Sequence, residues 1–120
     1  MKAFKNLIPL NHKITIYVPS TKDINTPIDN TKEVEATAKL LSNCFGGATS
    51  TEAVGYWVSD TMGLVKEHPT LVYAYATEEN FKKYIDLILD YCYQLLKDMS
   101  QDAISLEIDN QLYLIDKNNI

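Results

Sequence analysis

All four glycines of this 120-residue chain fall between residues 45 and 68, in the segment FGGATSTEAVGYWVSDTMGLVKEH, which also holds its single tryptophan. A glycine-rich loop binds phosphate when its backbone amides open a helix that follows a strand. The pair Gly46-Gly47 lacks the GxxxxGK(S/T) and GxGxxG spacings, and it follows a predicted helix instead. We therefore interpret the glycines as a helix cap, a thinned strand and a hairpin turn, and not as a nucleotide loop.

Acid–base chemistry is the next candidate, because Glu67 and His68 are adjacent and histidine titrates near neutral pH. Neighbouring residues of a strand point to opposite faces, so these two side chains should not meet. No motif ties a serine or cysteine nucleophile to His68. The sequence therefore predicts no catalytic residues, and it predicts that His68 is an exposed strand histidine.

The chain holds two cysteines, Cys44 and Cys92, and two histidines, without CxxC, HxxxH or HExxH spacing. Metal sites need more ligands than this at such spacings. Both cysteines fall on apolar stripes of predicted helices, where free buried thiols are usual. We expect no metal site, no cofactor and two free thiols, with a Cys44–Cys92 disulfide as the alternative.

The distribution of charge narrows the class of partner. The net charge is −5, with residues 1–45 near +2 and residues 46–120 near −7, and every basic residue is a lysine. Arginine supplies the planar fork that reads guanine and phosphate, so its absence argues against direct nucleic-acid binding. A genome that favours lysine codons would also explain the missing arginines.

Aromatic and acidic side chains form the candidate partner-binding set. Tyrosine and tryptophan are favoured interface anchors, and an acidic surface steers toward a basic protein groove. The alternatives are ordinary strand packing for the aromatic residues and a solvated surface for the acids. The candidates are Tyr56, Trp57, Asp60, Glu67, Tyr73, Tyr75, Glu107 and Asp109.

The first half of the chain predicts a strand, a loop and a helix. The alternating segment KITIYVP, residues 13–19, predicts a half-buried strand, and residues 19–30 predict a long polar loop. Asn30 and Glu33 suit a capping box at the start of a helix, and Gly46 suits its left-handed end. The apolar face of this helix should carry Val34, Ala38, Leu41 and Cys44 or Phe45.

The second half predicts a hairpin, a long helix and two more strands. Residues 48–58 and 64–76 predict strands joined by the turn SDTMG, with Pro69 at a bulge or an edge. Thr77 suits an N-cap, and apolar residues recur at helical spacing from Phe81 to Met99. Strands at residues 103–108 and 111–115 should follow, joined by a two-residue turn.

The order of elements predicts one α+β domain over residues 1–120, with an N-terminal extension at residues 1–12. It is β-α-β-β-α-β plus a C-terminal strand, which favours a ferredoxin-like split βαβ sandwich with two helices on one face of an antiparallel sheet. The other face should meet solvent or a partner. No apolar run is long enough to cross a membrane, and we expect a cytoplasmic protein.

The segment FGGATSTEAVGYWVSDTMGLVKEHPTLVYAYA, with the later QDAISLEIDNQLYLI, resembles a widespread group of small uncharacterised bacterial proteins with ferredoxin-like domains. Such proteins are frequent on phages, plasmids and other mobile elements of low-GC bacteria. The resemblance spans about residues 13–115 and implies no catalytic role for any position. Its motif positions are Phe45, Gly46, Gly47, Thr49, Gly55, Trp57, Gly63, Leu64, Val65, Glu67, Gln101, Ala103, Ile104, Leu106 and Glu107.

The sequence and the resemblance together favour a non-enzymatic acidic module that binds a host or defence-system protein with a basic surface. A mobile-element counter-defence inhibitor of the anti-CRISPR type would have this character. The alternative is a small-molecule-binding or enzymatic dimeric ferredoxin-like domain that uses the open sheet face. A homodimer that pairs through the sheet is a third possibility.

Overall fold

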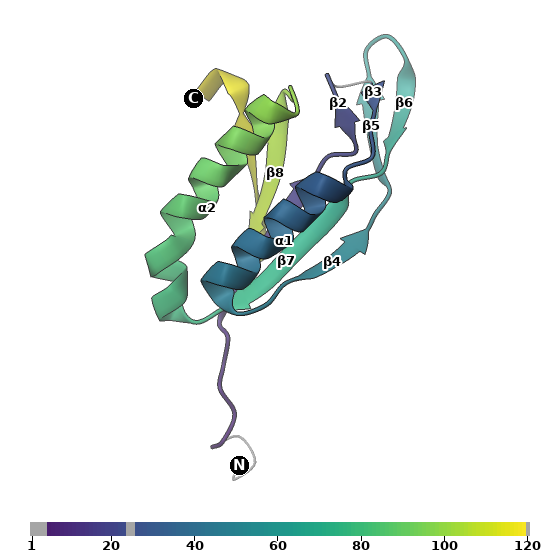
Figure 1. The fold of residues 1–120 in the computed structure, drawn as a ribbon. Helices are drawn as coiled ribbons and strands as arrows, with labels where there is room; N and C mark the ends of the chain where they lie inside the picture. The colour runs from purple at the N-terminus through teal and green to yellow at the C-terminus, as the bar shows by residue number, and fades with distance from the viewer. Residues whose placement is uncertain (1–4, 24–25, 120) are drawn as a thin grey trace.

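The computed structural model describes residues 5–23 and 26–119 and shows an α+β fold. Two helices, α1 (Thr31–Phe45) and α2 (Glu78–Asp98), cover one face of an antiparallel sheet (Figure 1). The predicted class and the predicted number of long helices are confirmed. Neither helix of the described residues is long and apolar enough to cross a membrane.

The main sheet has five strands in the order β4-β7-β1-β8-β9, and each strand runs antiparallel to its neighbours. Its strands are β1 (His12–Val18), β4 (Thr49–Glu52), β7 (Thr70–Ala76), β8 (Ala103–Ile108) and β9 (Gln111–Asp116). The two-residue turn between β8 and β9 forms as predicted, because Asp109 and Asn110 both adopt positive φ.

The core lies between the sheet and the helices. Alternate residues of β1, Ile14, Ile16 and Val18, are fully buried, which is why β1 occupies the centre of the sheet. The helices contribute the apolar stripes that the sequence predicts, with Leu41 from α1 and Cys92 from α2 fully buried. The remaining core residues are Cys44, Val72, Ala74, Ala76, Ile88, Leu95, Leu96, Met99, Ile104, Leu106 and Ile115.

The helix ends follow the predicted chemistry except at one position. The Thr77 hydroxyl accepts a hydrogen bond from the Asn80 amide, and Gly46 takes the left-handed conformation after α1. The capping box at Asn30 is wrong, because this side chain makes no cap bond and its amide nitrogen donates to the carbonyl of Pro19. The Asp29 carboxylate instead accepts from the Thr31 amide.

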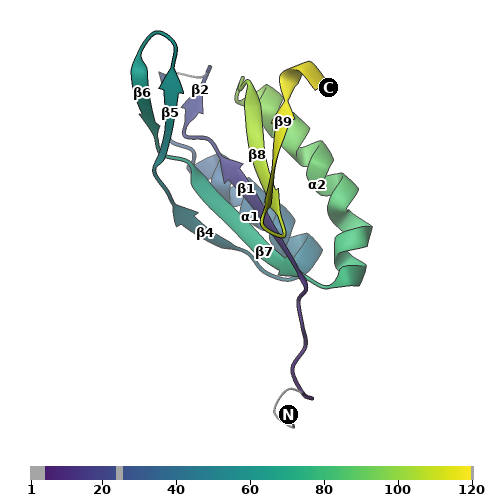
Figure 2. The ribbon, with the colours of Figure 1, turned by 180° about the vertical axis from the view of Figure 1, so that it is seen from behind.

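The predicted long strands at residues 48–58 and 64–76 are each broken in two. The first becomes β4 and β5 (Gly55–Ser59), and the second becomes β6 (Gly63–Glu67) and β7. β5 and β6 pair only with each other and form a hairpin that leaves the main sheet, as Figure 2 shows. Pro69 explains the break, because proline has no amide hydrogen to continue a ladder into β6.

The polar loop at residues 19–30 holds a short ladder of β2 (Thr21–Lys22) and β3 (Thr26–Pro27), and residues 24–25 lie outside the described residues. Of the predicted extension at residues 1–12, residues 1–4 lie outside the described residues and His12 opens β1. A 3-10 helix at Lys117–Asn119 follows β9.

Candidate functional site

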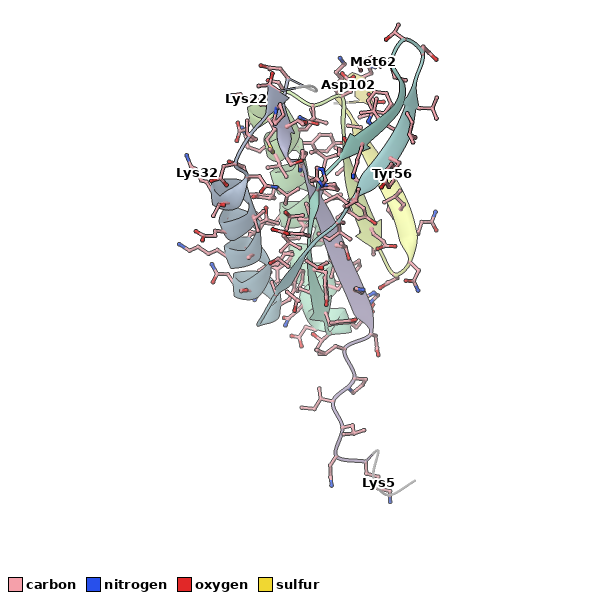
Figure 3. The ribbon with its side chains drawn as sticks, turned by 90° about the vertical axis from the view of Figure 1, so that its right-hand side faces the viewer. Lys5, Lys22, Lys32, Tyr56, Met62 and Asp102 are labelled. Carbon is pink, nitrogen blue, oxygen red and sulfur yellow. The ribbon has the colours of Figure 1, made fainter. Side chains whose placement is uncertain are left out.

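A cleft opens where the β5–β6 hairpin leaves the sheet. It has a volume of about 310 Å³ and lies between the hairpin, the β2–β3 ladder and the start of β8. Figures 1 and 2 both place the hairpin beside β2, and Figure 3 places Lys22, Asp102 and Met62 at the same end of the molecule. The lining residues are Thr21, Pro27, Trp57, Val65, Lys66, Glu67, Gln101, Asp102 and Ala103.

One face of the hairpin lines the cleft, and the opposite face carries the exposed Tyr56. Trp57 pairs with Val65, and Gly55 pairs with Glu67, so these residues share the face that lines the cleft. Tyr56 lies on the opposite face of the hairpin and is 60% exposed. Trp57 is 40% exposed, so its indole ring is available to a ligand in the cleft.

Glu67 stands at the junction of two cavities. It lines the cleft and also a smaller cavity of about 90 Å³, which Tyr17 and Ser105 line from the open face of the sheet. Gly55 lies beside this side chain, and a Cβ at that position would lie 3.4 Å from the Glu67 Cγ, at van der Waals contact. Among the described residues, no cationic group lies within ion-pair distance of the Glu67 carboxylate.

The wall opposite the hairpin is formed by the start of β8. Asp102 is paired with Lys117, with 2.6 Å between the carboxylate oxygen and Nζ. Gln101 lines both cavities and holds its side-chain amide against two backbone carbonyls. Sequence reasoning did not assign a binding role to Gln101, although this residue belongs to the Q-x-A-I pattern at the start of the strand.

The other predicted binding residues lie apart from the cleft. Tyr73 and Tyr75 are on the open sheet face, where their rings meet edge to face at 6.1 Å beneath the Lys13 ammonium. Glu107 lies two strands away on the same face, across β1. Asp60 is in the turn between β5 and β6. The structure therefore brings only Trp57 and Glu67 of the predicted set into the cleft.

Asp109 belongs to a separate cluster around His12, which sequence reasoning did not find. The His12 Nδ1 lies 2.6 Å from an Asp109 oxygen, its Nε2 is bonded to Glu78, and its ring stacks on Phe81 at 4.1 Å. These bonds, first that to Glu78 and then that to Asp109, raise the pKa of His12. No sequence signal could link residues 66 and 97 positions apart.

His68 and the two cysteines lie outside the cleft. His68 lines a different groove with Glu52 and Thr70, so it does not meet Glu67 within a shared cavity. Cys44 and Cys92 are free and buried, and burial raises the pKa of Cys92 to about 12. Across residues 5–23 and 26–119, no three His, Cys, Asp or Glu side chains could hold a metal ion.

A larger groove of about 620 Å³ runs between α1 and α2, but its charged side chains do not form a set that suits one ligand. Its charged lining residues have both signs: Lys22 comes from β2, Lys32 and Glu33 come from α1, and Asp98 comes from α2. Its aromatic residue, Tyr91, already bonds its hydroxyl to Thr37 at 2.7 Å. We therefore place the candidate site in the hairpin cleft.

Two solved structures match this fold over most of its length. One is described as a phage SAM lyase in complex with S-methyl-5'-thioadenosine, with a TM-score of 0.67, 16% identity, and coverage of 94% of this chain and 95% of that chain. The fold resembles that of a phage SAM lyase. The second is the phage SAM lyase in its apo state, with a TM-score of 0.62, 16% identity and coverage of 88% of each chain.

The other comparisons add no family. No protein-family model matches the chain, and no curated protein sequence matches it. At 16% identity the structural match establishes the shared fold alone.

The expected non-enzymatic inhibitor of the anti-CRISPR type is contradicted by this match. Both structural neighbours are described as lyases, and one of them holds a nucleoside thioether. The physical reason for the wrong expectation is that acidic and aromatic side chains serve a small cationic aromatic ligand as well as a basic protein. The match favours the alternative of a small-molecule-binding or enzymatic domain.

Proposed function

We propose that this chain binds S-adenosylmethionine (SAM) in the hairpin cleft and cleaves it as a SAM lyase. The observation that carries the proposal is the convergence of Trp57 and Glu67 on one cleft of a fold that resembles a phage SAM lyase. SAM joins an adenine ring to a positively charged sulfonium. An indole ring suits the adenine, and a carboxylate suits the positive charge.

The reaction requires no proton transfer to or from the protein. S-methyl-5'-thioadenosine keeps the methyl group and the nucleoside of SAM, so the bond that breaks joins sulfur to the aminobutyrate chain. The bonding pair stays on sulfur, and the sulfonium leaves as a neutral thioether that needs no proton. This chemistry needs neither a general acid nor an activated nucleophile.

A lyase adds no water, so the carbon that loses its bond to sulfur must form a new bond to another atom of the substrate. An oxygen of the substrate's own carboxylate bonds to that carbon as the carbon–sulfur bond breaks, and a five-membered lactone results. The protein contributes by holding the substrate folded so that the carboxylate faces this carbon. The two adjoining cavities on either side of Glu67 would hold the nucleoside and the amino-acid chain.

Glu67 would favour the cationic substrate over the neutral product. Because the sulfonium charge disappears during the reaction, attraction to Glu67 is lost when the thioether forms, which assists product release. Trp57 would bind adenine equally in substrate and product. A stacked base contributes about 1–3 kcal/mol of binding free energy.

We also propose that the topology is the ferredoxin-like split βαβ. The order β4-β7-β1-β8 supports it, because two β-α-β units then interleave their strands, and β9 is added at the edge.

The proposal is tested by incubating the purified protein with SAM and following products by mass spectrometry. We expect release of S-methyl-5'-thioadenosine in equal amount to the SAM consumed, with no label gained from isotope-labelled water during turnover. Consumption of SAM that yields S-adenosylhomocysteine would assign a methyl transfer instead. A protein that consumes no SAM and binds neither SAM nor the thioether would overturn the proposal.

The position of the site is tested by replacing its aromatic wall. Trp57→Leu should weaken binding of S-methyl-5'-thioadenosine about tenfold in titration calorimetry, which corresponds to about 1.4 kcal/mol. Tyr113→Leu is the matched control, because Tyr113 is a 47% exposed aromatic residue of β9 that does not line the cleft. Equal losses in both variants would place the nucleoside elsewhere.

A further inference from the structure

Gln101 occupies a constrained position between α2 and β8. Its backbone amide donates to the carbonyl of Leu96 at 3.0 Å, which fixes the chain as it leaves the helix. Its side-chain nitrogen donates to the carbonyls of Thr21, at 2.9 Å, and of Met99, at 3.0 Å. These bonds tie the start of β2 to the end of α2 at the edge of the cleft.

The two carbonyl partners determine which way the amide faces. A glutamine side chain has two hydrogens on nitrogen and an acceptor oxygen. Both hydrogens are used, and the reversed amide would set its oxygen against two carbonyl oxygens, which cannot donate. The polar atom that Gln101 retains for a ligand is therefore Oε1, a neutral acceptor.

The other polar groups of the cleft leave a distinct role for this acceptor. Lys66 is a cation, Thr21 carries a hydroxyl, Glu67 carries the charge that suits a cation, and the Asp102 carboxylate is engaged by Lys117. A neutral acceptor suits a neutral donor, and Trp57 in the same cleft provides the surface for an aromatic ring. The adenine part of SAM carries such a donor in its exocyclic amino group.

We propose that Gln101 is a specificity-determining residue of the cleft, whose Oε1 accepts a hydrogen bond from the 6-amino group of adenine. This inference rests on the proposed function, because it assumes that the cleft binds the nucleoside of SAM. A purine with an oxygen at that position would set two acceptors against each other. A purine with hydrogen there would leave Oε1 without a partner, and both changes weaken binding.

The ligand series tests the inference on the unaltered protein. Titration calorimetry compares S-methyl-5'-thioadenosine with its 6-oxo counterpart and with the counterpart that carries hydrogen at position 6. We expect the amino compound to bind about tenfold more tightly than the hydrogen compound, and the oxo compound to bind most weakly. Equal affinity for all three would overturn the role of Gln101 and leave SAM cleavage standing, whereas no binding of any would overturn the proposed function itself.

Two variants connect the preference to this side chain. Gln101→Lys keeps donors for the carbonyls of Thr21 and Met99 but offers no acceptor, so we expect its preference to shift from the amino to the oxo compound. Gln101→Met has neither strong donor nor strong acceptor, and its affinities should lie within about twofold of each other. A folded variant that keeps the full preference for the amino compound would assign the reading of adenine to another residue.

Discussion

Glu67 connects the chemistry of the site to the local sequence. Its side chain borders both cavities and lies beside Gly55. The glycine that thins the predicted strand therefore lies next to the carboxylate at the base of the hairpin.

Replacing Glu67 by glutamine should separate the affinities for substrate and product. Glu67→Gln keeps the shape of the side chain and removes its charge, so SAM should bind about tenfold more weakly, or about 1.4 kcal/mol. S-methyl-5'-thioadenosine is neutral and should bind within about twofold of its original affinity. Calorimetric titration of both ligands measures the two effects.

Glu79→Gln is the matched control for that experiment. Glu79 is an exposed glutamate in the first turn of α2 and lines neither cavity at the hairpin. Its replacement should leave both affinities unchanged. An equal loss for SAM and the thioether in Glu67→Gln would show that the residue shapes the cleft and does not act through its charge.

Thr15 offers a prediction about stability at a single residue. Its side chain is 2% exposed, and its hydroxyl is a buried polar atom without a hydrogen-bond partner among the described residues. Thr15→Val keeps the branched shape and removes the desolvated hydroxyl, so the free energy of unfolding should rise by about 1 kcal/mol. Thermal denaturation should show an increase of about 4 °C. A lower melting temperature would indicate that the hydroxyl has a partner in solution.

Residue types alone brought Trp57 and Glu67 into the candidate set, Trp57 as an aromatic anchor and Glu67 as part of an acidic surface. The role proposed for Gln101 depends on the carbonyl of Thr21, 80 residues away, as well as on that of the nearby Met99, and no pattern in the sequence encodes the distant contact. Likewise, Asn30 has the right type for a helix cap, but the carbonyl of Pro19 takes its amide instead.

At the scale of elements, the hairpin formed by β5 and β6 determines whether a cleft exists. The sequence predicted both halves of this hairpin but joined them to β4 and β7, because Pro69 is also compatible with a bulge or an edge position within one strand. The split depends on where the ladder stops. The amide of Ala53 still donates to the carbonyl of Pro69 at 3.0 Å, and beyond that bond the hairpin diverges from the sheet.

Removing the hairpin should abolish binding and preserve the fold. None of the buried core residues comes from residues 53–69, so the core does not depend on this element. A variant that joins Ala53 to Pro69 through a short glycine turn should unfold cooperatively and keep its circular dichroism spectrum. It should bind neither SAM nor the thioether. Retention of ligand binding in this variant would exclude the cleft as the site.

At the scale of the whole molecule, the cluster around His12 joins three elements that are distant in sequence. The imidazole connects the start of β1 to the first turn of α2 through Glu78 and to the β8–β9 turn through Asp109. Lys82 also approaches Glu78, at 3.4 Å, and the Lys13 amide donates to Asp109. The cluster lies at the opposite end of β8 from the cleft, so its contribution is to the stability of the fold.

The titration of this cluster predicts how stability depends on pH. The hydrogen bond with Glu78, followed by that with Asp109, raises the pKa of His12 above its ordinary value of 6.5. Its contribution is therefore complete below pH 6.5 and is lost as the pH rises through the higher folded value. The bond with His12 lowers the pKa of Glu78 below 4.5. The contribution of Glu78 to stability is therefore lost only as the pH falls through the pKa that Glu78 has in the folded protein.

Like Glu78, Asp109 sets the acidic limit of the pH range in which the cluster stabilises the fold. Burial raises its pKa, but bonds from the Lys13 amide and from His12 outweigh this effect and bring the pKa below 3.8. The cluster should stabilise the fold most between pH 4.5 and pH 6.5. Melting temperatures measured from about pH 5 to about pH 9 should fall at the alkaline end in the wild-type protein.

His12→Asn supplies the comparison for that series. This variant has no group that titrates near neutral pH at the cluster, so its melting temperature should change less over the same range. His68→Asn is the matched control, because His68 is exposed and is not bonded to a carboxylate in the described residues. An identical pH dependence in His12→Asn and the wild type would assign the effect to other groups.

The central claim is that this chain cleaves SAM between sulfur and the aminobutyrate chain. The release of S-methyl-5'-thioadenosine from SAM tests this claim most directly. With purified protein and SAM, we predict a thioether signal that grows with time and with protein concentration, and that is lost when both Trp57 and Glu67 are replaced. SAM that stays intact beside folded wild-type protein, at a rate of decay no faster than in buffer alone, would contradict the assignment of this chain as a SAM lyase.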